Sequence, residues 1–337
     1  MKKINVLYQS NDSYAPITGV SIFSLLENNK DIDILNIFVL NDGIKEENIM
    51  KMKKMCKSYK RDIFFLDTDV IIKKIKDLKL VPYKGTYTTY FKLFVFDEIK
   101  TNNDIILQLD GDTIINGSLA ELCDFNFNGN IMAATYDCIV NDYKKMVDIP
   151  LNEPYYNCGV LLIDQKKWRD YKCKEKIVDH LKNKRNSYFI VDQDIINVLF
   201  RKNIAYLDLT YNFNSGFYIY GAKNSINMYK LNKTFFHPLD LIKLRMKQPK
   251  INHCMGAMTG RPWELENCHP QNDLFDKYLY KSPWHDYKKI VPKRSTIFKI
   301  QKKLYDVLPI NIYIYIHRYI QILYYYINNK KVKQNER

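Results

Sequence analysis

The sequence lacks the glycine-rich fingerprint of dinucleotide-binding enzymes. No Gly-x-Gly-x-x-Gly arrangement occurs anywhere in its 337 residues. In Rossmann dehydrogenases those glycines make the first tight turn and let the backbone approach the pyrophosphate of the cofactor. The absence therefore disfavours a dinucleotide-dependent dehydrogenase.

Paired cysteines and an export signal are also missing. Seven cysteines are present, an odd number, and no two of them form a Cys-x-x-Cys pair. This pattern argues against a disulfide framework and against structural zinc, and it fits a reducing compartment. The opening residues, MKKINVLYQS, contain neither a long apolar segment nor a small-residue cleavage site, so they predict a first strand rather than a signal peptide. We therefore expect a cytoplasmic protein.

Nucleic-acid-binding motifs are absent as well, although the net charge is +15. No zinc finger, helix-turn-helix or basic-glycine-aromatic RNA motif accompanies the charge. Residues 288–337 contain twelve lysines and arginines but only two acids, so ten of the fifteen excess charges lie there. We expect no nucleic-acid partner. We expect this region to attach peripherally to an anionic surface, the inner face of a bacterial cell membrane.

Residues 312–327, IYIYIHRYIQILYYYI, form a tyrosine-rich apolar segment within that basic region. The segment is too short and too polar to span a bilayer comfortably. Tyrosines with basic flanks are typical of a helix that lies at the headgroup boundary, and the alternative is a terminal helix docked on the protein's own core. If the segment is helical, it carries an apolar stripe at Ile312, Ile316, Ile320, Leu323 and Ile327.

The order of apolar and amphipathic segments predicts an α/β fold. Short apolar runs alternate with helical patterns through the first half of the chain, as they do in parallel βαβ units. We predict one large α/β domain at residues 1–270, with a basic, tyrosine-rich, membrane-associating helical region at residues 271–337. Strands are expected at 4–10, 34–42, 63–69, 105–109, 131–138, 158–164 and 205–209, and helices at 20–29, 49–59 and 86–97.

A pair of carboxylates follows one of these strands, in the segment LQLDGDTII at residues 107–115. Asp110 and Asp112 would lie at the carboxyl end of the strand, where open α/β sheets place their ligands. Gly111 leaves no side chain between the two acids and lets the backbone turn, so both can face one hard divalent cation. The alternative is a solvated turn, in which aspartate and glycine are common.

Two further segments offer polar side chains near strand or helix ends. The loop after the first strand, LYQSNDSYAP, supplies Gln9, Asn11, Asp12 and Tyr14, which can hydrogen-bond and stack on a base and ribose. An ordinary βα loop has the same composition. The segment DQDIIN at residues 192–197 begins a predicted helix, where capping explains one aspartate but not a glutamine between two of them.

The segment INHCMGAMTGRPW, residues 251–263, is expected to form a loop with a phosphate-binding character. Gly256 would permit a close backbone approach, and Arg261 would bind phosphate oxygens with its planar fork. His253 in the same loop is a candidate ligand, although a lone histidine is more often a core or surface residue.

The segments SNDSYAP, TTYFKL, LQLDGDTII, YYNCGVLLID, DQDIIN and INHCMGAMTGRPW, in this order and spacing, resemble glycosyltransferase family 8. The likeness covers residues 3–265. It implies a GT-A fold, which is a Rossmann-like nucleotide-binding mixed sheet flanked by helices. It also implies a UDP-hexose donor, Mn²⁺ or Mg²⁺ as the metal, and transfer with retention of anomeric configuration.

The resemblance also implies roles for individual residues. Lys92 stands where the family commonly has arginine. Lysine keeps the positive charge but lacks the planar guanidinium group that binds two oxygens at once. The final loop is two residues longer than the family's usual pattern. The implied metal ligands are Asp110, Asp112 and His253; the implied donor-binding residues are Gln9, Asn11, Tyr14, Lys92, Asp110, Gly111, Gly256 and Arg261; and the implied catalytic residues are Asn157, Asp192 and Gln193.

The implied activity is that of a metal-dependent retaining hexosyltransferase. It would move glucose or galactose from a UDP-sugar to a cell-surface glycan or glycolipid, such as lipopolysaccharide or a lipid-linked oligosaccharide. The alternatives are a protein O-glycosyltransferase of the same fold and a non-catalytic nucleotide-sugar-binding protein. A glycosidase is disfavoured because its two carboxyl groups must lie apart, across the substrate bond. No obvious strong nucleophile is present, which favours same-face substitution over a covalent double displacement.

Overall fold

The computed structural model describes residues 1–83, 85–231, 235–256 and 258–334. A seven-stranded sheet forms its centre, in the order β3-β2-β1-β4-β7-β6-β8. Strands β3, β2, β1 and β4 run parallel, whereas β7 is antiparallel to both β4 and β6, so the predicted mixed sheet is confirmed. The strands are β1 (Lys3–Asn11), β2 (Ile34–Asp42), β3 (Asp62–Asp67), β4 (Ile105–Leu109), β6 (Met132–Tyr136), β7 (Tyr156–Asp164) and β8 (Ile204–Tyr206).

A second, three-stranded sheet lies beside the first, in the order β5-β10-β9. Its strands are β5 (Thr113–Ile115), β9 (Phe213–Asn214) and β10 (Ile251–His253). Strand β10 pairs antiparallel with β5, which places His253 opposite Thr113. The prediction of a loop from residue 251 is therefore wrong at its start, because backbone pairing with β5 orders His253 at a strand end.

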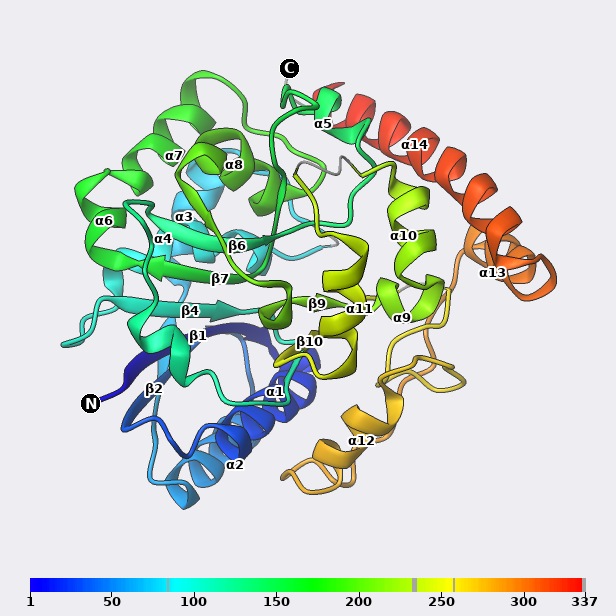
Figure 1. Ribbon diagram of the computed structural model, residues 1–337. Coiled ribbons are helices and arrows are strands. Elements are labelled where there is room, and N and C mark those ends of the chain that lie inside the picture. The colour runs from blue at the N-terminus through cyan, green and yellow to red at the C-terminus, as the bar shows by residue number, and fades with distance from the viewer. Residues whose placement is uncertain (84, 232–234, 257, 335–337) are drawn as a thin grey trace.

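Helices cover both faces of the large sheet (Figure 1). One face packs against α1 (Ala15–Asn28), α2 (Glu46–Ser58) and α12 (Asn272–Leu279), and the other against α3 (Asp69–Asp77), α6 (Gln165–Asp170), α7 (Cys173–Asn183) and α8 (Val191–Phe200). Alternate residues of one strand serve the two cores: Val6 and Tyr8 face the first group of helices, and Leu7 faces the second. Burial on both faces explains why the strands are nearly continuous apolar runs.

The predicted helix over residues 86–97 is wrong. The chain there forms the 3₁₀ turn η2 (Thr88–Tyr90), the short helix α4 (Lys92–Val95) and the 3₁₀ turn η3 (Phe96–Glu98). The Thr86 hydroxyl accepts a hydrogen bond from the Thr88 backbone N–H at 3.1 Å and donates to Asp42, which fixes a turn instead of a first helical turn. Clustered β-branched and aromatic residues also lower helix propensity.

The remaining elements are short, apart from the last helix. They are η1 (Asp12–Tyr14), η4 (Ala120–Asp124), α5 (Tyr143–Met146), η5 (Arg201–Asn203), η6 (Leu209–Tyr211), α9 (Gly216–Tyr220), α10 (Ala222–Tyr229), α11 (Leu239–Lys247), α13 (Thr296–Val307) and α14 (Ile310–Gln334).

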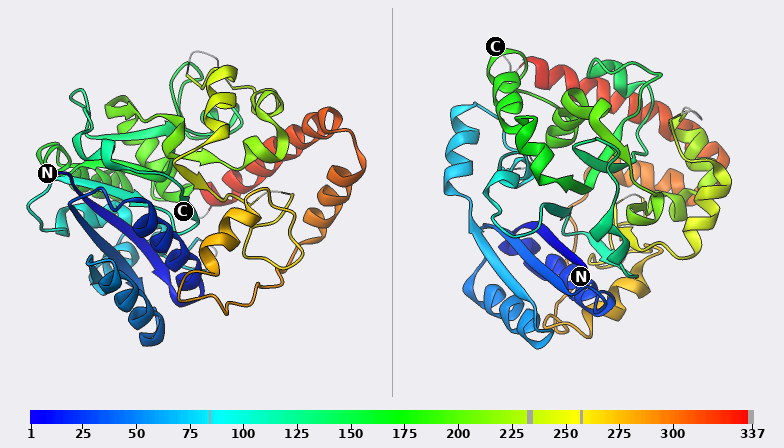
Figure 2. Two further views of the ribbon diagram at one scale, coloured as in Figure 1. Left: turned by 60° about the horizontal axis from the view of Figure 1, so that its bottom comes forward. Right: turned by 60° about the vertical axis from the view of Figure 1, so that its left-hand side comes forward.

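Helix α14 docks lengthwise against α10 and α5 and extends well beyond the predicted segment 312–327 (Figure 2). Its inner face buries Tyr313 and His317, and Asn329 donates to the Met146 carbonyl oxygen at 3.1 Å. The stripe predicted from the sequence lies outward or at the edge, with Ile312 and Leu323 exposed. Within the described residues, no helix is long and apolar enough to cross a membrane.

The stretch that joins the large sheet to α13 packs in the main core. Phe275 of α12 and Trp284 belong to the same core cluster as α1. The Trp284 indole lies so close to Gly19 that a Cβ there would sit 2.2 Å from it. A boundary at residue 270 stays a prediction, and the last part of the predicted membrane-associating region, residues 335–337, lies outside the described residues.

Candidate active site

A pocket of about 450 Å³ opens at the carboxyl ends of β1 and β4. Because β7 runs antiparallel to β4, the start of β7 reaches the same edge of the sheet, and the Asp110 backbone N–H donates to the Gly159 carbonyl oxygen at 2.8 Å. Residues widely separated in the sequence therefore meet here. All the residues to which the family resemblance assigns a role line this pocket: Gln9, Asn11, Tyr14, Lys92, Asp110, Gly111, Asp112, Asn157, Asp192, Gln193, His253, Gly256 and Arg261.

Three of these side chains form a group that could hold a metal ion. One ligand atom from each of Asp110, Asp112 and His253 lies within 4.8 Å of the others. His253 Nδ1 lies 3.0 Å from the Asn212 side-chain oxygen, so an Nδ1–H donor leaves Nε2 as the ligand atom. His253 Nε2 faces Asp112 Oδ1 at 3.3 Å. Two carboxylates and an imidazole are a donor set that suits Mn²⁺ or Mg²⁺.

Glycines make this arrangement possible by leaving space. A Cβ on Gly159 would lie 2.2 Å from His253 Cε1, and a Cβ on Gly111 would lie 2.4 Å from the Thr18 hydroxyl oxygen. The backbone turns at Gly111 as predicted, with the Thr113 backbone N–H donating to the Asp110 carbonyl oxygen at 3.2 Å, although Gly111 is not among the residues with positive φ. Close approach of neighbouring side chains, not backbone freedom, requires glycine at both positions.

Lys92 joins the metal group to Asp192. Its ammonium is almost fully buried and lies 3.0 Å from Asp110 Oδ1, 3.2 Å from Asp192 Oδ2 and 2.9 Å from the Cys158 carbonyl oxygen. Three acceptors satisfy the three protons of a lysine ammonium. Burial raises the pKa of Asp192 to about 6, although the nearby Lys92 ammonium lowers it. For Lys92, burial lowers the pKa, but the carboxylates of Asp110 and Asp192 raise it by more, so the net pKa lies above its ordinary value.

A buried carboxylate that the sequence analysis missed orients two of the predicted catalytic amides. Asp137, at the end of β6, accepts from the Asn157 amide at 3.0 Å and from the Gln193 amide at 2.9 Å. The Gln193 oxygen in turn accepts from the Cys158 backbone N–H at 3.0 Å. Burial raises the pKa of Asp137. Its place after the apolar run IMAATY was a usable signal, because Asp110 follows β4 in the same way.

Arg261 lies across the pocket from Lys92. Its guanidinium donates to the Tyr14 hydroxyl at 2.9 Å and to Asp112 Oδ2 at 3.2 Å. A Cβ on Gly256 would lie 2.8 Å from Arg261 Nε, so glycine makes room for the arginine. Tyr14 also meets the edge of Trp263, with ring centroids 5.8 Å apart. Residue 257, within the lengthened loop, lies outside the described residues.

The predicted loop from Gln9 is wrong at its start, because β1 continues to Asn11, and the end of β1 and the turn η1 divide their polar residues between the pocket and the fold. The Gln9 side-chain oxygen is buried in the pocket wall without a hydrogen-bond partner among the described residues. Asn11 reaches the pocket, but its oxygen accepts from the Tyr14 backbone N–H at 3.0 Å and caps η1. Asp12 turns away, because it accepts from the Lys45 backbone N–H and the Asn48 amide at the start of α2.

The two aspartates of the DQD segment have different roles. Asp194 is fully buried and accepts from the Ile190 backbone N–H at 2.8 Å and from the hydroxyls of Tyr143 and Tyr155 at 2.6 Å each. It therefore helps to fix the start of α8 from within the helix. The interpretation that one aspartate is the N-cap is wrong, because the N-cap is Ile190 and has no side-chain cap. Asp192 faces the pocket instead, beside Gln193. The helix start predicted at this position is confirmed.

Comparison with known proteins identifies the family. The sequence profile of glycosyl transferase family 8 matches residues 5–263. The chain belongs to this family. As a glycosyltransferase it has the predicted GT-A fold, since the solved structure of the galactosyltransferase LgtC with donor and acceptor sugar analogues superposes with a TM-score of 0.67 at 24% identity, covering 83% of this chain and 96% of that one.

Two curated family members are similar to this transferase along most of their length. The lipopolysaccharide 1,2-glucosyltransferase of Escherichia coli K12 is 29% identical over 290 residues, which cover 84% of this chain and 79% of that protein. The lipopolysaccharide 1,3-galactosyltransferase of Salmonella typhimurium is 26% identical over 291 residues, with the same coverage of 84% and 79%.

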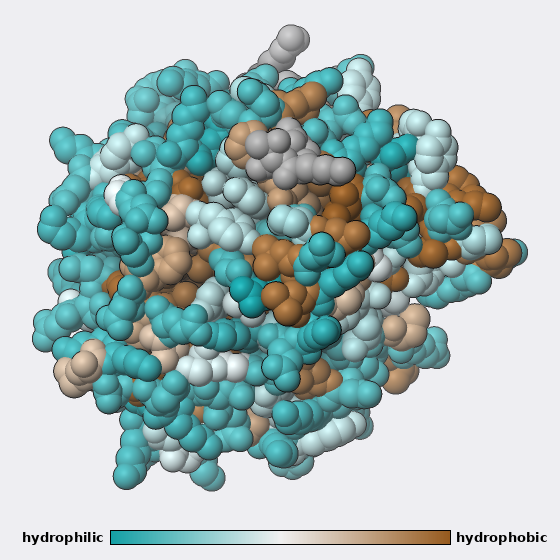
Figure 3. Space-filling view, viewed as in Figure 1, coloured by the Kyte–Doolittle hydropathy of each residue, from teal (hydrophilic) through white to brown (hydrophobic). Residues whose placement is uncertain are grey.

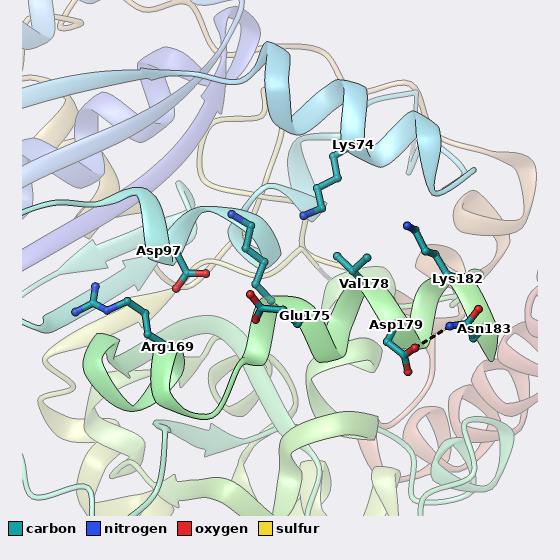
Figure 4. A pocket seen from close by; sticks show the side chains of 9 residues that line it. Lys74, Asp97, Arg169, Glu175, Val178, Asp179, Lys182 and Asn183 are labelled. Carbon is teal, nitrogen blue, oxygen red and sulfur yellow. Dashed lines mark hydrogen bonds between the residues drawn. The ribbon is translucent and has the colours of Figure 1, made fainter.

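The transferase has a second, larger hollow of about 680 Å³, between α3, α6 and α7 (Figure 4). Lys74 points into it from α3, and Lys182 and Asp179 belong to α7. Asp179 and Asn183 bond to each other along the helix at 2.7 Å. None of the residues predicted for the active site lines this hollow.

Proposed function

We propose that this transferase moves glucose or galactose from a UDP-sugar to a saccharide of lipopolysaccharide or a related lipid-linked glycan, with retention of configuration and with Mn²⁺ or Mg²⁺. The grouping of Asp110, Asp112 and His253 beside Arg261 carries the proposal. The two bacterial relatives are lipopolysaccharide glucosyl- and galactosyltransferases, which supports the acceptor class.

The wall of the pocket suits a uridine diphosphate. The unpartnered buried oxygen of Gln9 is available to a donor group of the base. The Arg261 guanidinium joins the Tyr14 hydroxyl to Asp112, and its planar pair of N–H donors matches phosphate oxygens. A divalent cation held by Asp110, Asp112 and His253 would supply positive charge to the diphosphate, as a Lewis acid.

The remaining residues act on the sugar. Asp192 places negative charge beside the anomeric carbon, where the sugar becomes cationic in the transition state. Lys92 lies between Asp110 and Asp192 and offsets the repulsion between these two carboxylates. The amides of Asn157 and Gln193 are held by Asp137, so they offer fixed hydrogen bonds to sugar hydroxyls. We propose that Gln193 positions the sugar and does not attack it.

The substitution we propose takes place on one face of the sugar. The bond from the anomeric carbon to the diphosphate oxygen breaks, and the acceptor hydroxyl forms the new bond on the face that the diphosphate leaves. The acceptor proton passes to the departing diphosphate oxygen. The amide of Gln193 is a poor nucleophile, and this favours the single-face route over a covalent intermediate.

We also propose that α13 and α14 attach the enzyme peripherally to the inner, anionic face of a bacterial membrane, through residues 288–337. The outward side of these helices is apolar and aromatic, and a hydrophobic area covers this flank in Figure 3. Lysines flank it at Lys330 and Lys331, as is typical of interfacial helices. The exposed side chains are Ile297, Ile300, Val307, Ile312, Tyr315, Tyr319, Leu323, Tyr326 and Ile327.

Vesicle sedimentation tests the attachment. The Leu323→Asp variant should lose most of its binding to vesicles that contain phosphatidylglycerol, because a charge replaces an apolar contact while the inner face of α14 is untouched. Val70→Asp is the matched control, since Val70 is an equally apolar exposed residue on α3. Equal binding by both variants would contradict the membrane proposal.

Donor turnover tests the activity. The purified enzyme should hydrolyse UDP-glucose or UDP-galactose slowly in the presence of Mn²⁺, and the activity should disappear in excess chelator and return with added Mn²⁺. Turnover that persists in chelator would contradict the metal assignment. Tight binding of UDP without any turnover would instead support the non-catalytic nucleotide-sugar-binding alternative.

A further inference from the structure

A second, narrower groove adjoins the donor pocket. It has a volume of about 200 Å³ and lies between the loop before η2, the turn before α8 and the end of α14. Tyr90 and Tyr188 are buried in it, and Val81 lies exposed. Its lining residues are Val81, Pro82, Tyr83, Tyr90, Ser187, Tyr188, Phe189, Val191, Asn328, Lys331 and Val332.

The groove shares part of its wall with the donor pocket. Tyr83 and Val191 line both cavities, and Val191 directly precedes Asp192, which we place beside the donor sugar. The groove therefore adjoins the part of the donor pocket that Asp192 lines.

The turn between the two cavities has a fixed and strained shape. Val191 has a φ of 28°, a value that β-branched residues rarely adopt. Asp194 holds this turn through the Ile190 backbone N–H, at 2.8 Å. Strain that the surrounding structure maintains is found most often at ligand sites. The shape of the divide between the cavities is therefore built into the fold.

The chemistry of the groove matches a sugar ring. Aromatic faces pack against the C–H face of a hexose, and the Ser187 hydroxyl and the Asn328 amide are of the kind that bonds sugar hydroxyls. The volume is below the range of pockets for drug-sized ligands, so it suits one sugar unit. Lys331, at the solvent side, would favour an acidic or phosphorylated substituent.

Helix α14 contributes one wall of the groove. Asn328 and Lys331 line it, while the neighbouring Asn329 anchors the helix by accepting from Arg185 at 3.1 Å and donating to the Met146 carbonyl oxygen. Phe189 meets Tyr324 and Tyr325 edge-on, with centroids 5.7 and 5.8 Å apart. The helix that carries the exposed apolar side thus also shapes a cavity beside the donor.

We propose that this groove is an acceptor subsite, which binds the sugar unit next to the one that receives the hexose. The inference rests on the proposed function, because it assumes that the acceptor is a saccharide. It predicts that the enzyme prefers an acceptor of two or more sugar units over a single sugar, and that the end of α14 contributes to this preference.

Saturation-transfer NMR with defined sugars tests the subsite. The probes are lactose, maltose and cellobiose, each compared with methyl glucoside and methyl galactoside, in the presence of UDP and the diamagnetic ion Mg²⁺. At least one disaccharide should give a several-fold stronger signal than either single sugar. Phe189→Ala and Asn328→Ala should each reduce that signal several-fold, while the UDP signal in the same sample reports an intact donor pocket.

Matched controls and a second readout separate the possible failures. Tyr326→Ala replaces an aromatic residue on the outward side of α14, and Asn311→Ala an exposed asparagine at its start; neither should change the disaccharide signal. Asn328→Ala leaves Phe189 in place, so it tests the groove even if Phe189→Ala loosens α14. Equal signals from variants and controls, or no disaccharide signal in the wild-type protein, would overturn the subsite. Absence of UDP-hexose turnover in the wild-type protein would instead overturn the proposed function.

Discussion

The donor pocket and the hollow between α3, α6 and α7 differ in how their charges are held. In the donor pocket, Lys92 is buried against two carboxylates and Asp112 lies between His253 and Arg261. In the larger hollow between α3 and α7, Lys182 and Asp179 are exposed. Buried charges persist only with partners, whereas exposed charges need none. We therefore expect the smaller hollow to carry the chemistry, and matched substitutions in the two hollows should have different effects.

The largest effect should follow loss of a metal ligand. Asp112→Ala should reduce UDP-hexose turnover by about 10³-fold, the size of losing a preorganised electrostatic group. The equivalent change in the larger hollow, Asp179→Ala, should leave turnover unchanged. Steady-state assays at saturating Mn²⁺ measure both, and equal losses would mean that the two hollows do not differ as described.

Removal of the buried ammonium should come next. Lys92→Met leaves Asp110 and Asp192 without their shared cation, and breaking such a buried pair costs about 3–5 kcal/mol of the free energy of unfolding. Lys182→Met, in the exposed hollow, should cost less than about 0.5 kcal/mol. Urea unfolding of the metal-free proteins measures the difference. A small effect for Lys92→Met would show that water reaches the pair.

Asp137→Asn should have an intermediate effect on catalysis. An asparagine cannot accept from both the Asn157 and the Gln193 amides through two carboxylate oxygens, so those side chains lose their fixed orientation. We expect kcat to fall about 10–100-fold, as for other positioning partners, with a smaller change in the KM for the donor. The control is Asp97→Asn, a half-buried acid of the larger hollow. A change in KM alone would contradict a positioning role.

The pH dependence of stability should change least. Burial raises the pKa of Asp194 to about 6, above the ordinary value of 3.8. Because the folded state holds this proton more tightly than the unfolded state, Asp194 contributes to the free energy of unfolding. The contribution is fully present below pH 3.8 and is lost as the pH rises through 6. The free energy of unfolding should fall by on the order of 2 kcal/mol between pH 4 and 7 because of Asp194, and Asp194→Asn should remove this fall. Urea midpoints across this range test the prediction, with Asp179→Asn expected to keep the wild-type slope.

The sequence was sufficient for the parts of the site that local patterns encode. Asp110 follows an apolar strand, and the Asp192–Gln193 pair begins a helix, so each could be located from its own segment. All the predicted residues line one pocket because β1, β4 and the start of β7 reach the same edge of the sheet.

Features that depend on pairing between distant segments could not be predicted. Asn212 supports His253 only because β9 and β10 lie side by side, and no local pattern marks it. The sequence pattern of the last helix is compatible both with a helix at a membrane surface and with a helix docked on the protein core. In the structure α14 docks with one side and leaves the other exposed, because a helix presents two faces to different surroundings. The turns at residues 88–98 depend on the hydrogen bond from Thr86 to Asp42 at the end of β2.

The most direct test is anomalous diffraction at the manganese edge, from crystals of the enzyme soaked with MnCl₂ and UDP. A single strong peak within about 2.5 Å of ligand atoms of Asp110, Asp112 and His253, and adjoining the diphosphate, is the predicted result. A manganese peak elsewhere, or bound UDP with all three side chains turned away from it, would contradict a metal-assisted departure of the nucleotide.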